Sequence, residues 1–313
     1  MAMNNVQDVA PFKESTHLLN EPKKLRETAE KEGYLFFKGL LPASAISELR
    51  KDVLEICKRH KFLKEDSTLM DGIAASGFVI VESSVNPDYL SYYREIQQLH
   101  SFHALAHHPN LLKALNVLFD GETLVHPLKI LRTIFPQAQK HTTPPHQDYF
   151  HVRGTENTWT SWIPIGDCDK ELGGLTLVPG SQNWGLLPEH PAEGAGLIGI
   201  NVPIDSEWVT EPFEAGDVLM FHSHTVHQGI DNNSVDKMRL SMDCRFQALR
   251  EKKIGPVAVR SPHLHCIDWD GLYKNWAADD PLRYYWTDLN LEIDQSAPPT
   301  IGTPENPHPS AMA

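Results

Sequence analysis

Residues 216–229 have the sequence GDVLMFHSHTVHQG, and this stretch decides the predicted fold class. A Gly-Asp turn signal opens it, and the apolar run that follows predicts a buried strand. The strand delivers His222, His224 and His227 to its far end.

Short β-like runs separated by proline and glycine fill the chain from Thr123 onward. Several short strands with turn signals between them are typical of a sandwich or a barrel. The predicted strands are residues 123–135, 159–165, 175–178, 208–213, 217–222 and 238–249.

Helical patterns dominate the sequence before residue 120. Apolar side chains recur at helical spacing over residues 43–59, with Ser44 near the start. Further helices are predicted over 89–99, 101–106 and 109–118, and one strand over 33–37. The predicted fold is therefore α+β and mainly β: a double-stranded β-helix (jelly-roll) core flanked by N-terminal helices.

We interpret residues 1–313 as a single domain, which is compatible with this length. Within it, residues 1–25 are expected to be an extended N-terminal segment, and residues 30–250 the jelly-roll core with its helical support. Residues 251–295 form an aromatic-rich extension, of which 269–285 is expected to fold back onto the body. Residues 296–313 are rich in proline and are expected to be a loose tail.

Composition excludes several classes of protein. The formal net charge of −13 argues against a nucleic-acid partner, because phosphate backbones demand patches of Lys and Arg. The four cysteines form no CxxC pair, which favours a reducing compartment. We expect no secretion leader and no membrane span, since no run of about 18 apolar residues occurs. A cytoplasmic protein with a small-molecule partner is expected; the sequence does not determine the oligomeric state.

His146 and Asp148 are the first two candidates for a metal site. Residues i and i+2 of a strand point to the same side, so both side chains can reach one point, and His227 must arrive from a distant strand. Two imidazoles and one carboxylate, without thiolates, are the facial triad of non-haem Fe(II) oxygenases. Arg239, which opens another strand, offers a fixed fork of donors for a dicarboxylate co-substrate. These residues favour an Fe(II)- and 2-oxoglutarate-dependent dioxygenase.

Four segments in this order resemble the phytanoyl-CoA dioxygenase family over about residues 30–250. They are EGYLFFKGLLP at 32–42, PHQD at 145–148, GGLTLVPGS at 173–181, and Gly216-Asp217 followed by His227 and Arg239. One departure is Gln182, which stands where the family often has histidine.

The resemblance implies a jelly-roll fold and Fe(II) held by His146, Asp148 and His227, which are then the catalytic residues. It also implies that Arg239 binds the distal carboxylate of 2-oxoglutarate, with O2 as the other co-substrate. His222 and His224 are rivals for the third ligand position. His227 is favoured because Gly229 follows it in the family manner and because the spacing to the arginine is counted from it.

Seven neighbours are candidate contacts, each with a purely structural alternative. Ser241 lies two residues after Arg239 and so faces the same side. Co-substrate contacts are expected from Ser241, Arg132 and Trp162, and substrate contacts from Tyr149, Phe150, Trp159 and His224.

The predicted reaction is hydroxylation of a small organic substrate with release of succinate and CO2. Desaturation or cyclisation would use the same ligands, and no segment selects a substrate. Because Asp148 is a carboxylate, halogenation, which needs a free position for halide, is disfavoured. Two alternatives stay open: a zinc-type jelly-roll hydrolase or isomerase, in which Arg239 has no evident role, and a non-catalytic small-molecule-binding relative.

Overall fold

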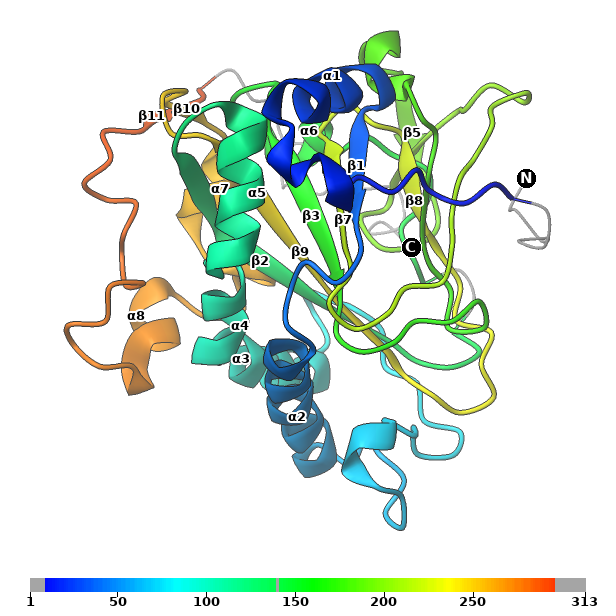
Figure 1. Cartoon of the computed structure of the whole chain (residues 1–313). Coiled ribbons are helices and arrows are strands. Elements are labelled where there is room, and N and C mark those ends of the chain that lie inside the picture. The colour runs from blue at the N-terminus through cyan, green and yellow to red at the C-terminus, as the bar shows by residue number, and fades with distance from the viewer. Residues whose placement is uncertain (1–8, 139–140, 296–313) are drawn as a thin grey trace.

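The structure is a computed structural model, and it describes residues 9–138 and 141–295. The expected loose tail, 296–313, lies outside the described residues. Figure 1 shows a central sheet with helices on one side and shorter strands on the other. Helices predominate before residue 120 and strands after it, so the predicted mixed fold is confirmed.

The central sheet has five antiparallel strands in the order β1-β7-β3-β9-β2. Smaller pairs are β4 with β8 and β5 with β6, both antiparallel, and β10 with β11, which is parallel. Their bounds are β1 Tyr34–Phe37, β2 Thr123–Ile134, β3 Trp159–Pro164, β4 Gly174–Leu177, β5 Glu189–Pro191, β6 Ile198–Ile200, β7 Val218–His222, β8 His227–Ile230, β9 Arg239–Ala248, β10 Lys253–Ile254 and β11 Glu292–Ile293.

Strand β9 separates the core from the functional pocket. Its even-numbered side chains, from Leu240 to Ala248, lie in the main hydrophobic core. Its odd-numbered side chains from Arg239 to Arg245 line a pocket on the opposite face. This alternation is the period of two that a strand imposes on its side chains.

The helices before residue 120 cover the core face of the sheet. The predicted helix 43–59 is confirmed as α2, while α3 begins earlier than expected because Asn86 caps it and Pro87 occupies its first turn. The helices are α1 Pro22–Glu32, α2 Ala43–Arg59, α3 Pro87–Gln97, α4 His100–Leu105, α5 Pro109–Phe119, α6 Asp148–Val152, α7 Pro256–Arg260 and α8 Trp269–Leu272, with 3-10 turns at Thr16–Asn20, Leu69–Asp71, Ser181–Trp184, His263–His265 and Tyr273–Asn275.

Two expected segments differ from the structure. The segment 1–25 is not extended throughout, because a 3-10 turn spans Thr16–Asn20 and α1 starts at Pro22. Residues 208–213 form no strand and contribute only single bridges at Val209 and Phe213. Pro212 lacks a backbone N–H, which prevents a continuous ladder there.

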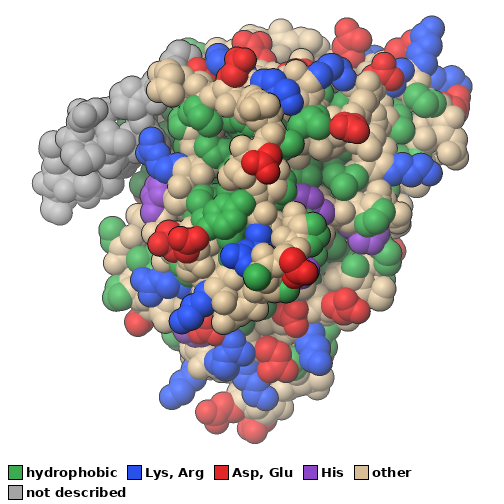
Figure 2. All heavy atoms as spheres, turned by 90° about the vertical axis from the view of Figure 1, so that its left-hand side faces the viewer, with side chains coloured by type: hydrophobic (Ala, Val, Ile, Leu, Met, Phe, Trp, Pro, Cys, Tyr) green, Lys and Arg blue, Asp and Glu red, His purple; other side chains and the backbone are tan. Residues whose placement is uncertain are grey.

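The aromatic-rich C-terminal extension folds back onto α3, α4 and β2, as expected. Tyr285 Oη donates to Val125 O at 2.9 Å, and Trp276 Nε1 donates to Gln98 O at 2.9 Å. On the side where α8 lies, acidic and basic side chains are mixed over the surface (Figure 2). None of the helices in the described parts of the chain is both long and apolar enough to cross a bilayer.

Candidate metal centre and co-substrate pocket

Three side chains converge at one end of the pocket. The ligand atoms of His146, Asp148 and His227 all lie within 4.8 Å of one another. The distances to Asp148 Oδ1 are 3.6 Å from His146 Nε2 and 3.9 Å from His227 Nε2. His146 and His227 are tied together by a backbone bridge, with N–H to O distances of 3.0 and 3.1 Å. The predicted ligand set is thus brought together.

The local structure around these residues differs from the expected strand. The backbone is extended only as far as Gln147 (φ −121°, ψ 127°), and Asp148 is the first residue of α6. Gln147 anchors this turn, because its amide Nε2 donates to His224 O at 2.8 Å. His227 also does not end β7, since it begins β8 after a turn.

Both imidazoles are held with Nε2 directed at the site. Nδ1 of His146 lies 2.8 Å from Pro144 O, and Nδ1 of His227 lies 2.9 Å from Thr225 O. Because a carbonyl only accepts, each Nδ1 carries the proton and each Nε2 keeps its lone pair for a metal. Burial, with His146 adding to it, lowers the pKa of His227 to about 3, so this ring is neutral.

Asp148 is buried and ionised. Arg245 Nη2 lies 3.2 Å from each carboxylate oxygen, and Thr160 Oγ1 donates to Oδ2. Burial by itself would raise the pKa of Asp148, but the charge of Arg245 opposes it most strongly, and the pKa is held well below its usual value. Two neutral imidazoles and an ionised carboxylate form a donor set that fits Fe(II).

Sequence reasoning did not single out Arg245 or Thr160. The signal was present, because Arg245 has the same parity as Arg239 along the predicted strand 238–249 and therefore faces the same side. The sequence did not indicate which residue Arg245 pairs with, because its partner Asp148 lies 97 residues away.

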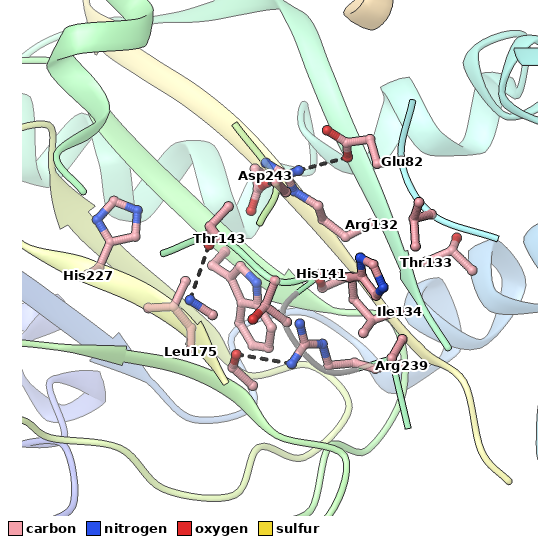
Figure 3. A pocket seen from close by; sticks show the side chains of 18 of the residues that line it. Glu82, Arg132, Thr133, Ile134, His141, Thr143, Leu175, His227, Arg239 and Asp243 are labelled. Carbon is pink, nitrogen blue, oxygen red and sulfur yellow. Dashed lines mark hydrogen bonds and ion pairs between the residues drawn. The ribbon is translucent and has the colours of Figure 1, made fainter. Parts of the chain in front are cut away.

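The pocket extends from the triad to Arg239. Figure 3 shows His227 and Arg239 on opposite sides of this space. The predicted co-substrate contacts Arg132, Trp162 and Ser241 also line it. The four side chains on which the sequence prediction depends therefore share one pocket.

The three guanidiniums of the described pocket lining have different partners. Arg245 pairs with Asp148, while Arg132 is engaged by Glu82 at 2.7 Å (from Nη1) and by Asp243 at 3.1 Å (from Nε). The contact expected from Arg132 to the co-substrate would therefore require this guanidinium to share its donors.

Arg239 differs from the other two, because Nη1 meets only backbone carbonyls. These are the carbonyls of Leu172, Gly174 and Ile230, at 3.4, 3.2 and 2.5 Å. Its Nε and the hydroxyl of Ser241 are buried without a hydrogen-bond partner among the described residues. A buried cation without a counter-charge is costly, so this end of the pocket fits a carboxylate ligand.

The four expected substrate contacts lie outside the pocket lining. The rings of Tyr149 and Phe150 pack against the guanidinium of Arg153, whose Cζ lies 5.4 and 4.8 Å from their centroids. Trp159 packs against His222, with ring centroids 5.8 Å apart.

The rival ligands also lie away from the triad. His224 packs against Tyr149 with ring centroids 5.0 Å apart, and neither His222 nor His224 lines the pocket. His227 is therefore the histidine that joins His146 and Asp148.

Two histidines and one aspartate around one point, next to a buried guanidinium without an ion pair in the described chain, are typical of the non-haem iron oxygenases that use a dicarboxylate co-substrate. The family model for phytanoyl-CoA dioxygenase matches residues 29–241, and the chain belongs to this family. The resemblance and the reaction class predicted from the sequence are thereby confirmed: the chain is an Fe(II)- and 2-oxoglutarate-dependent oxygenase.

Similar proteins span most of the chain. The 1-deoxypentalenic acid 11-beta-hydroxylase of Streptomyces arenae is 26% identical, covering 75% of this chain and 84% of the relative. The peroxisomal phytanoyl-CoA dioxygenase of Bos taurus is 25% identical, covering 71% and 67%. The solved structure of the epimerase SnoN in complex with Fe3+, alpha ketoglutarate and nogalamycin RO is 23% identical, with a TM-score of 0.50 and coverage of 74% and 84%. This last likeness concerns the fold alone.

Proposed function

We propose that the chain hydroxylates a small organic substrate while it converts 2-oxoglutarate to succinate and CO2, with Fe(II) held by His146, Asp148 and His227. The observation that carries this proposal is Arg239. It is the one guanidinium in the described lining without a carboxylate partner, and it shares the pocket with the triad.

We assign the two facing groups of strands to a double-stranded β-helix, or jelly roll, which with its helical support forms the core, residues 30–250, of a single domain over residues 1–313. The pocket lies between β9, β2 and β3 on one side and β4 and β8 on the other. A site between two sheets supports this assignment.

The pocket has a charge balance that suits both Fe(II) and 2-oxoglutarate. Fe(II) brings two positive charges and 2-oxoglutarate two negative ones, so filling the pocket with both leaves its net charge unchanged. The described lining is already balanced, with three carboxylates against three guanidiniums. They are Glu82, Asp148 and Asp243 against Arg132, Arg239 and Arg245.

The protein positions its co-substrate and excludes water from it. Arg239 anchors the far carboxylate of 2-oxoglutarate through a charge-assisted hydrogen bond that contributes roughly 1.5–3 kcal/mol. Ser241 Oγ, which has no hydrogen-bond partner among the described residues, would donate to the same carboxylate, and Trp162 and Leu175 would close the pocket around it. When bound, Fe(II) with 2-oxoglutarate and O2 supplies the oxidising power that converts C–H into C–OH.

The rest of the wall supports an organic substrate whose reacting part is uncharged. Ile80, Val81 and Tyr89 contribute apolar surface, and Thr142 and Thr143 contribute hydroxyl groups. Since Arg132 and Arg245 are already paired, a substrate carboxylate would find no free guanidinium among the described residues of this wall.

The test is a spectroscopic titration without oxygen. Wild-type protein with Fe(II) and 2-oxoglutarate should show the weak visible charge-transfer band of the chelate, and succinate should be released in air. His227→Ala should lose the band, whereas His224→Ala, a histidine outside the pocket, should keep it. A wild type without the band, or His227→Ala with an unchanged band, contradicts the proposal and leaves the zinc-type alternative.

A further inference from the structure

The two oxygens of the Asp148 carboxylate have different surroundings. Oδ1 faces the two imidazole Nε2 atoms, at 3.6 and 3.9 Å. Oδ2 accepts from Thr160 Oγ1, and Arg245 Nη2 lies over the carboxylate edge at 3.2 Å from both oxygens. Arg245 thus holds both oxygens, and the difference between them is that Oδ1 faces the metal position while Oδ2 has Thr160 as an additional donor.

The sheet register builds this clamp. Thr160 on β3 and Arg245 on β9 are direct cross-strand partners in the antiparallel pair. Side chains of directly opposite residues lie on the same face and close together. Both therefore reach the same carboxylate from one side, although Asp148 itself belongs to the separate turn at α6.

Arg245 has no other counter-charge within ion-pairing distance in the described chain. Its side chain is buried, its Nε lacks a hydrogen-bond partner, and its ion pair is with Asp148. By contrast Arg132, on the neighbouring strand β2, is neutralised by Glu82 and Asp243. The guanidinium of Arg245 is therefore dedicated to the carboxylate of a metal ligand.

We propose that Arg245 is a positioning residue that, together with Thr160, holds Asp148 as a one-oxygen ligand. A carboxylate can bind a metal through one oxygen or through two. If each of the three residues supplied one atom to a six-coordinate Fe(II), three positions would stay free, enough for the two atoms of the 2-oxoglutarate chelate and for O2. A second oxygen of Asp148 would take one of them. This inference rests on the proposed function and adds a reason for the open face.

A thermodynamic cycle tests the contact in the metal-free protein. The midpoints of thermal unfolding are measured for wild type, Arg245→Gln, Asp148→Asn and the double variant. Each single change leaves one buried charge without its partner, so each should lower the midpoint. The decrease in the double variant should be smaller than the sum of the two single decreases. Strictly additive losses would show that the two side chains do not act on one another.

A titration of the Fe(II) protein with 2-oxoglutarate, without oxygen, tests the positioning role. In Arg245→Gln the dissociation constant of 2-oxoglutarate should rise by about 10-fold, the lower end of the range over which partners of metal ligands alter metal affinity or activity. The maximum of the charge-transfer band should move, because the ligand field of the iron changes. Fe(II) affinity should not fall, because a nearby positive charge is removed.

Matched variants separate this role from others. Thr160→Val should shift the band in the same direction by less, and Arg245→Lys should restore part of the affinity. Arg239→Gln should raise the dissociation constant without moving the band, because it acts at the far carboxylate.

Two results would overturn the inference. One is a weakened 2-oxoglutarate titration in Arg245→Gln with an unmoved band, and the other is a titration identical to wild type. If wild type itself gives no band, the proposed function fails as well, which distinguishes the two failures.

Discussion

The two faces of β9 are almost equally buried and yet serve opposite purposes. On the helix face, Leu240, Met242, Cys244, Phe246 and Ala248 are at most 3% exposed and pack in the main core. On the pocket face, Arg239, Ser241, Asp243 and Arg245 are at most 7% exposed and carry charge or a hydroxyl. Burial alone therefore does not identify stabilising residues.

The difference lies in how each face satisfies its side chains. Burial of the apolar groups on the helix face lowers the free energy of the folded state, because it removes them from water. Charged groups on the pocket face lose hydration, and they need partners to offset that loss. Arg245 and Asp243 have such partners within the protein, while Arg239 has only carbonyls. We infer that the helix face supplies stability and the pocket face keeps a site ready for ligand.

The largest expected effect is on the helix face. Phe246→Ala removes a fully buried ring from the core and should lower the free energy of unfolding by about 3–5 kcal/mol. The protein that remains folded should bind 2-oxoglutarate with nearly wild-type affinity. Urea unfolding and the charge-transfer titration measure the two quantities. A large loss of affinity in folded protein would show that the two faces are not separable.

Arg239→Gln is the counterpart on the pocket face. Loss of a charge-assisted hydrogen bond of about 1.5–3 kcal/mol should raise the dissociation constant of 2-oxoglutarate by roughly 10- to 150-fold. Stability should not fall by a similar amount, because a buried charge without a counter-ion is removed. The same two measurements apply, and an equal loss of iron affinity would contradict the assigned role.

Lys129 is the charged exception on the helix face and offers a test by pH. It lies opposite Cys244, is 1% exposed, and donates to His126 O and Pro127 O at 3.2 and 3.3 Å. Burial lowers its pKa to about 8. Below that pH the folded protein carries a buried ammonium, so this group destabilises the fold there.

The sign of the pH effect follows from proton binding. Between pH 8 and about 10.4, the ordinary lysine value, the unfolded chain binds more protons, so stability should rise with pH in that window. Lys129→Met should remove this rise and stabilise the protein at pH 7 by about 1–2 kcal/mol, after the loss of two hydrogen bonds. Urea unfolding of wild type and variant across this pH range measures the free energy of unfolding. A variant less stable than wild type at pH 7 would show that the two hydrogen bonds outweigh the buried charge.

Ser241→Ala should have the smallest effect. Its hydroxyl lies buried beside Arg239 without a partner in the described structure, and it is expected to donate to the co-substrate. Because Arg239 already pairs with this carboxylate, the hydroxyl should add about as much as an ordinary hydrogen bond, roughly 0.5–1.5 kcal/mol, and the dissociation constant should rise about 2- to 13-fold. An unchanged constant would leave the serine without a role on this face.

The sequence by itself determined the faces of β9 and the members of the candidate metal site. Alternation along residues 238–249 is a local property, because a strand sends neighbouring side chains to opposite sides whatever lies around it. The motif of His146, Asp148, His227 and Arg239 was equally readable, since metal and carboxylate chemistry restrict the residue types that can serve.

Only the tertiary structure decided which charges meet. Arg245 and Asp148 are 97 residues apart, and Arg132 and Glu82 are 50 apart, so their pairing depends on strand register and on how the loops return. The same holds for Asp148 at the start of α6 rather than in a strand. Local patterns give the direction of a side chain, but its partner is set by contacts between segments that are distant in sequence, and these contacts leave no local periodicity to read.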